Sequence, residues 1–300
     1  MRDFPFTGTE RASSLSSRPR GAQWVSALKG AGKEFLADDC LGLAQEIAYS
    51  ALLAFFPSVI LLVGVLGLVG PGAYDSLIHL LGPVAPKAVL DVLNLARDSS
   101  TRNQAGSAIA LAIGIVAALW AASGATGSVI KAVNRASELE ETRPFWKTRL
   151  LALFLVILTG LVTAVVFVMI VFGGPLGDAI ARRAHLGHWF VVLWGAARWP
   201  IAFGGILSFF SIVYYVAPNR TTRSWRWVTP GAVVGSLLWL AISALFSLFT
   251  SFSSSYDRTY GTLAGAIILL LWLNYSAVAL LYGAELNAEL EPEGRPRATG

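Results

Sequence analysis

Two carboxylates border long uncharged segments, and they are the residues best placed to do chemistry. Glu46 comes directly before an uncharged stretch that begins at residue 47, and Glu285 directly follows one that ends at residue 284. Ionisable groups at membrane depth are costly and usually functional. With Tyr49 and Asn287 they would form an ion or substrate site suited to a proton or cation relay. The alternative is a structural ion pair with one of three basic residues: Arg135, Arg143 or Arg149.

Hydroxyl groups recur at helical spacing in two later apolar segments. A polar stripe on a membrane helix seldom faces lipid, so these side chains are predicted to face other helices. They either hydrogen-bond between helices or line a hydrated cavity, and the sequence leaves both open. The candidate cavity residues are Ser208, Ser211, Tyr215, Ser236, Ser243 and Ser247.

Two short polar segments mix arginine or lysine with tryptophan next to apolar stretches. Such residues anchor helices at a membrane interface and attract anionic lipid. The candidate headgroup contacts are Arg143, Trp146, Lys147, Arg223, Trp225 and Arg226.

Signatures of soluble enzymes and metal sites are missing from the sequence. His185 and His188 have the i, i+3 spacing of helical metal ligands, but Asp178 is the only carboxylate near them, and Cys40 is the single cysteine. No phosphate-binding loop, zinc-protease motif or nucleophile elbow occurs. We therefore expect no enzyme activity, no metal, no cofactor and no nucleic-acid partner.

The elements that would position these residues are six stretches without Asp, Glu, Lys or Arg. Only 14% of the 300 residues are charged, against about 25% in soluble domains. Each stretch is long enough to cross a hydrocarbon core as a helix. The predicted spans are 47–70, 103–130, 150–177, 199–219, 227–256 and 259–284.

Basic residues are unevenly distributed between the two sides of this arrangement. With a cytoplasmic amino terminus, 16 of the 23 Lys and Arg residues lie inside and six outside, in agreement with the positive-inside rule. Residues 1–30 are predicted to be a disordered basic cytoplasmic tail, 31–290 a membrane domain and 291–300 a second tail. The external loop 71–102 holds two short amphipathic patterns separated by Pro83 and Pro86. The predicted fold is an all-α bundle of six transmembrane helices with short amphipathic helices in that loop.

Several motifs resemble those of the YihY/virulence factor BrkB family, once labelled ribonuclease BN. The resemblance covers roughly residues 30–290 in the expected order. The motifs that carry it are 46–57, 120–124, 140–147, 217–220, 227–231, 260–265 and 283–289. It implies a bacterial inner-membrane protein with six spans, and it implies no settled biochemical activity.

The leading functional prediction is a transporter, an exporter or a transport-assisting component. Its polar cavity would lie between the fourth and fifth spans, with Glu285 at the cytoplasmic mouth. The alternative is a non-catalytic scaffold or lipid-handling partner for envelope proteins. Membrane lipids are the expected partners. Small residues at Gly106, Ala110 and Gly114 could join helices within one chain or between two copies, so a homo-oligomer stays open.

Overall fold

The computed structural model describes residues 20–69, 104–167, 169, 173–220, 228–252 and 262–291. These residues form helices, and no strand occurs among them. The helices are α2 (Arg20–Ala37), α3 (Cys40–Val69), α6 (Gln104–Ala136), α7 (Phe145–Phe167), α8 (Gly173–Arg183), α9 (His188–Val216), α10 (Pro230–Phe252) and α12 (Thr262–Glu289).

Five described helices are long and apolar enough to cross a membrane. The candidate spans are Gly114–Ala136, Phe145–Val166, His188–Val216, Pro230–Phe249 and Gly265–Glu289. The predicted first span corresponds to α3, whose apolar stretch Cys40–Phe55 is shorter than these five. The prediction of an all-helical membrane fold is therefore confirmed, whereas the count of six spans stays a prediction.

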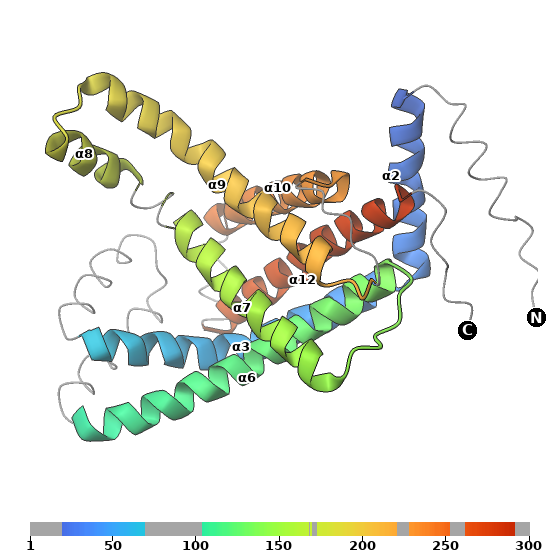
Figure 1. Ribbon diagram of the computed structural model, residues 1–300, viewed down its shortest axis with the longest axis horizontal. Coiled ribbons are helices and arrows are strands. Elements are labelled where there is room, and N and C mark those ends of the chain that lie inside the picture. Colours follow the sequence, from blue (N-terminus) through green and yellow to red (C-terminus); the bar gives the residue numbers. More distant parts are fainter. Residues whose placement is uncertain are drawn as a thin grey trace, which may run out of the picture.

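The long helices pack as a bundle, and α2 lies across one end of it (Figure 1). The largest interhelical contact joins α3 to α6, and α12 packs on both α10 and α3. Figure 1 shows α2 crossing the end of α12 instead of running alongside it, while α8 and the start of α9 project away from the bundle. The end near α2 also holds the polar residues described below.

The core is built from branched aliphatic side chains and alanines. Ile130, Val133, Leu155, Val213 and Leu281 are each at most 1% exposed. Alanines between them allow neighbouring helices to approach closely, which compensates for the weak hydrophobic driving force between helices in lipid. Many large apolar side chains on the outside of α7 and α10 stay exposed, as expected for surfaces that face lipid.

Two glycines set the closest approach in the bundle. A Cβ atom on Gly231 of α10 would overlap the carbonyl oxygen of Gly283 on α12. A Cβ atom on Gly283 would lie 2.5 Å from the carbonyl oxygen of Gly231 and would overlap the Tyr214 hydroxyl. Because two of these neighbours are backbone atoms, no rotamer change could relieve the overlap.

A helix occupies part of the segment that was predicted to be a disordered amino-terminal tail. Helix α2 begins at Arg20, whereas the disordered tail was predicted to extend to residue 30. This segment is polar and rich in glycine, so the sequence did not indicate a helix there. In the structure, Ala27 and Ala31 pack against Leu286 of α12. Tertiary packing thus stabilises a segment whose local composition favoured disorder.

The predicted third and fourth spans also end at different residues. The apolar stretch 150–177 contains α7 and the start of a separate helix, α8, which begins at the break Gly173-Gly174-Pro175. Helix α9 begins at His188, eleven residues before the predicted fourth span. Arg198, the residue before the predicted span 199–219, therefore lies within α9. The predicted helices of loop 71–102 lie outside the described residues.

Candidate functional site

Glu285 lies near the C-terminal end of α12 and is only 2% exposed. The Cys40 thiol at the start of α3 donates a hydrogen bond of 3.2 Å to its Oε1 atom. Three other carboxylates (Glu34, Asp38 and Glu138) lie close enough for their charges to act on Glu285. A buried carboxylate surrounded by acids is expensive to ionise, so this site favours a bound proton or cation.

Glu46 does not share this site. Its Oε2 atom pairs with Lys131 Nζ at 2.8 Å, and the two side chains are 41% and 64% exposed. Tyr49, the third member of the predicted site, is 61% exposed. The structure therefore separates Glu46 and Tyr49 from Glu285, because Glu46 faces α6 and its side chain is paired there.

The three basic residues considered as partners of Glu285 have other partners. Arg135 pairs with Asp38 at 3.3 Å, and Arg143 pairs with Glu141. Arg149 donates to the carbonyl oxygen of Trp120. Among the described residues, no ion pair of Glu285 with a basic side chain is present.

A buried asparagine connects two helices and a loop at the polar end of the bundle. Asn134, 2% exposed, donates to Glu141 Oε2 at 2.9 Å and accepts from the Asn219 backbone N–H at 2.7 Å. Arg143 donates to Glu141 and, at 2.8 Å, to the carbonyl oxygen of Ala217. We call these five residues the Asn134 junction. It brings together two of the motifs that carry the family resemblance, 140–147 and 217–220.

A second polar contact joins α10 to α12. Asn287 accepts from the Gly231 backbone N–H at 2.8 Å and donates to Thr229 Oγ1 at 3.0 Å. Tyr214 of α9 donates to the carbonyl oxygen of Leu280 at 2.7 Å. Asn287 thus caps α10 and is not directed at an ion site with Glu285, although it was predicted to share one.

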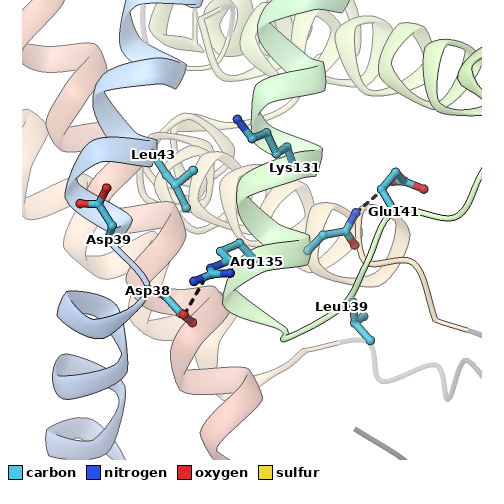
Figure 2. Close-up of a pocket in the computed structure, with 8 residues that line it drawn as sticks. Asp38, Asp39, Leu43, Lys131, Arg135, Leu139 and Glu141 are labelled. Carbon is cyan, nitrogen blue, oxygen red and sulfur yellow. Dashed lines mark hydrogen bonds and ion pairs between the residues drawn. The ribbon is translucent and has the colours of Figure 1, made fainter. Parts of the chain in front are cut away.

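An open pocket of about 430 Å³ lies beside the Asn134 junction. Figure 2 shows Arg135 joined to Asp38 by a dashed line. Asn134, which also lines the pocket, donates its hydrogen bond to Glu141. The pocket is lined by Asp38, Asp39, Leu43, Lys131, Asn134, Arg135, Leu139 and Glu141. Asp38, which lines this pocket, is also one of the carboxylates whose charges act on Glu285.

The two carboxylates at the ends of the pocket have opposite electrostatic environments. Burial raises the pKa of Asp38 above its ordinary value, although the charge of Arg135 opposes that shift. Burial also acts to raise the pKa of Glu141, but hydrogen bonds from Arg143 and Asn134 outweigh it and hold the pKa below its ordinary value. Glu141 is therefore a structural anion, and Asp38 accepts a proton more readily.

The hydroxyl groups of the predicted stripe differ in burial and in hydrogen-bond partner. Ser211 and Ser236 are buried, and their Oγ atoms have no hydrogen-bond partner. Ser243 accepts a bond of 3.2 Å from the Trp272 indole N–H, and Ser208 donates to the carbonyl oxygen of Gly204 within its own helix. Tyr215 is half-buried and Ser247 is exposed.

The predicted basic and aromatic rim is described only in part. Trp146 is 58% exposed with the Lys147 ammonium 5.3 Å from its ring centroid, an arrangement typical of a membrane interface. Arg143 is bound within the Asn134 junction and is not free for a lipid headgroup. Arg223, Trp225 and Arg226 lie outside the described residues.

His185 and His188 have the i, i+3 spacing of helical ligands but do not lie in the same helix. His185 has a φ of 52° in the turn between α8 and α9, and His188 is the first residue of α9, so the two do not share a helix. Among the described residues, no three His, Cys, Asp or Glu side chains are placed to hold a metal ion. The Arg198 guanidinium lies 5.3 Å from the Trp199 ring centroid.

Sequence reasoning assigned no role to Cys40, Asn134, Glu141 or Tyr214. A signal for Asn134 was present, because it is a small polar residue at the end of an apolar run and precedes a motif rich in charge. The contact between Cys40 and Glu285 joins residues 245 positions apart, and no local pattern predicts it.

The family described as Virulence factor BrkB matches residues 31–300. The chain belongs to this family. The motifs that form the Asn134 junction and the contact between α10 and α12 lie within the matched BrkB region.

Relatives of this BrkB protein carry membrane-protein names and one ribonuclease-like name. "Putative ribonuclease-like protein YfkH" of Bacillus subtilis is 30% identical over 266 residues, covering 89% of this chain and 95% of that protein. A "UPF0761 membrane protein" of Stenotrophomonas maltophilia is 26% identical, covering 85% of this chain and 58% of its own length. "UPF0761 membrane protein XAC0937" of Xanthomonas axonopodis is 24% identical, covering 90% and 62%. The chain thus spans about three fifths of these UPF0761 relatives. No solved structure matches the chain.

Proposed function

We propose that this BrkB-family membrane protein is a transporter, or a component that assists transport, in which Glu285 binds a proton or cation. The observation that carries the proposal is a carboxylate, 2% exposed within an apolar helix, whose hydrogen-bond partner is a thiol and not a basic side chain. A carboxylate kept only for stability would normally be paired with a cation. An unpaired carboxylate at membrane depth instead marks an ion pathway.

The pocket at the polar end of the bundle provides an entry route. Asp38 lies on its wall, and the charge of Asp38 acts on Glu285, so the pocket and the buried carboxylate lie in the same part of the bundle. The buried hydroxyls of Ser211 and Ser236 have no hydrogen-bond partner, so they are available as polar groups for the inner part of such a pathway. These features do not identify the substrate.

The proposed topology has six spans, with α3 as the first, in a bacterial inner membrane. Helix α3 is 30 residues long, which is more than the roughly 20 residues a span needs. Six spans place both termini on the same side, and the excess of basic residues favours the cytoplasm. Glu285 and the pocket would then face the cytoplasm.

Proton movement in vesicles tests the role of Glu285. Inverted membrane vesicles carrying the wild-type protein are given a pH gradient, and a pH-sensitive dye reports dissipation as candidate ions and amphiphiles are added. We expect at least one addition to dissipate the gradient in wild type, and Glu285→Gln to lose that response. Glu46→Gln is the matched control, because its carboxylate is exposed and paired with Lys131.

Equal responses from Glu285→Gln and wild type would exclude Glu285 as the ion site. Melting temperatures of both variants should match wild type, so that a lost response is not caused by unfolding. If Glu46→Gln also loses the response while remaining folded, the site is not confined to Glu285 and the assignment fails.

Lipid handling is a second candidate function, favoured by the first turns of α7. Phe145 and Trp146 are 73% and 58% exposed, and Lys147 is near the Trp146 ring. Arg149 is stacked 4.0 Å from the Trp120 ring centroid. Such groups suit the headgroup region of an anionic leaflet.

Mass spectrometry of gently purified protein tests this alternative. Co-purified anionic phospholipid that is lost in Trp146→Ala with Lys147→Gln would favour lipid handling, whereas an unchanged lipid content would count against it. A homo-oligomer or an envelope partner would appear as added mass in the same experiment. We propose no nucleic-acid role, and the ribonuclease-like name of the Bacillus relative makes RNA cleavage by the purified protein a direct check.

A further inference from the structure

Helix α2 packs one face on the bundle and also carries large apolar side chains that are exposed. Ala27 and Ala31 are at most 4% exposed against Leu286 of α12. The Tyr282 hydroxyl donates to the carbonyl oxygen of Leu28 at 2.9 Å, and the Tyr282 ring lies 6.3 Å from the Phe35 ring. These contacts fix the rotation of α2 about its axis.

Apolar side chains on another part of α2 are exposed. Trp24, Val25 and Leu36 are 47%, 53% and 67% exposed. Val25 and Leu36 lie three helical turns apart, so they share a face, and Trp24 precedes Val25. We call these three residues the α2 strip.

Two lysines border the α2 strip. Lys29 and Lys33 follow Val25 at four-residue intervals, and both are exposed. A helix with an apolar strip, tryptophan at its edge and lysines beside it is suited to lie in a membrane interface, where the lysines reach the phosphate layer.

The position of α2 in the fold is suitable for this role. It crosses the end of α12, whereas the spans run along the bundle (Figure 1). Ala27 and Ala31 are buried against α12, and Trp24 and Val25 lie on the N-terminal side of both alanines. A helix that lies across the ends of spanning helices lies along the membrane surface.

We propose that α2 is an interfacial helix whose strip enters the leaflet at its end of the bundle, held by anionic headgroups at Lys29 and Lys33. A lipid surface is chosen over a protein groove because the strip is bordered by charges of one sign. Charge complementarity then identifies the occupant as a leaflet rich in anionic phospholipid. These residues are separate from the α7 residues of the second candidate function, so the two proposals can fail independently.

Spin labels in nanodiscs test this placement on the full chain. A nitroxide at Val25→Cys is compared with one at Ala37→Cys, an exposed position on the same helix away from the strip. Cys40 is the only native cysteine and is buried, so the unsubstituted protein supplies the labelling background. The measurement is the ratio of collisions with oxygen, which concentrates in lipid, to collisions with a water-soluble nickel chelate.

We expect a higher ratio at Val25→Cys than at Ala37→Cys in nanodiscs that contain anionic lipid. The ratio should fall toward the Ala37→Cys value when Lys29→Gln and Lys33→Gln are added, or when the lipid is entirely zwitterionic. Equal ratios at the two positions would overturn the interfacial placement. A Val25→Cys label shielded from both reagents would overturn it in favour of a protein partner or a second copy. A high ratio that ignores lipid charge would overturn the role of the lysines.

Discussion

At the scale of single residues, the consequences of close packing are sharpest at Gly283 and Gly231. Their backbones are in contact between α12 and α10, and the Tyr214 hydroxyl fills the remaining space. We expect Gly283→Ala to destabilise the protein by about 1–3 kcal/mol, because overpacking against backbone atoms cannot be relieved by rotamers. Thermal unfolding in detergent measures the change.

The matched control is Gly265→Ala in the same helix. No atom lies within 4 Å of a Cβ at that position. Alanine favours helix over glycine by about 0.5–1 kcal/mol, so this variant should be neutral or slightly more stable. Equal melting temperatures for Gly283→Ala and Gly265→Ala would contradict the close contact between α10 and α12.

Acid sensitivity is predicted at Glu141. Its pKa is lower in the folded protein than the ordinary value of 4.5, so the ionised carboxylate stabilises the fold above that pH. The stabilisation is lost as the pH falls through the folded pKa. We expect Glu141→Gln to melt below wild type at neutral pH, and the difference to shrink as the pH falls from about 5 to about 3. Glu140→Gln is the control, and a constant difference across this range would contradict the predicted linkage.

At the scale of elements, the Asn134 junction holds the ends of α6 and α9 and the loop before α7 together. Asn134→Ala would remove the acceptor of the partly buried Asn219 N–H and the donor to Glu141. An unsatisfied buried group costs about 1–3 kcal/mol, so we expect a lower melting temperature. Ser208→Ala should have little effect, because that exposed hydroxyl bonds only to its own helix.

The docking of α2 gives another test at this scale. Ala31 is completely buried against α12, whereas Gly32 beside it has no atom within 4 Å of a Cβ. We expect Ala31→Leu to loosen α2 and speed amide hydrogen exchange over residues 20–37. Gly32→Leu should leave exchange there unchanged or slower. Similar exchange in both variants would mean that α2 is not docked through its alanine row.

At the scale of the whole molecule, the number of spans decides the positions of the two termini. Six spans, with α3 as the first, place both termini on one side, whereas the five helices that meet the length and hydropathy requirements alone would place them on opposite sides. We expect fusions of a fluorescent protein to either terminus to fluoresce in bacterial cells, and fusions of alkaline phosphatase to be inactive. Active phosphatase at one terminus would exclude six spans.

Composition and hydropathy by themselves determined that this chain is a helical membrane protein, because the bilayer requires long uncharged helices whatever their arrangement. The motifs also determined its family. Glu285 could be indicated as a candidate site from the sequence, because a carboxylate beside a long uncharged segment is costly and usually functional.

Only the tertiary structure decided which polar groups meet. It separated Glu46 from Glu285 by pairing it with Lys131, and it bound Arg143 and Asn287 in structural contacts. It also brought Cys40 to Glu285 and docked α2 on α12. These contacts join residues far apart in the chain, and their geometry depends on how helices rotate and cross, which the hydropathy of single segments does not encode.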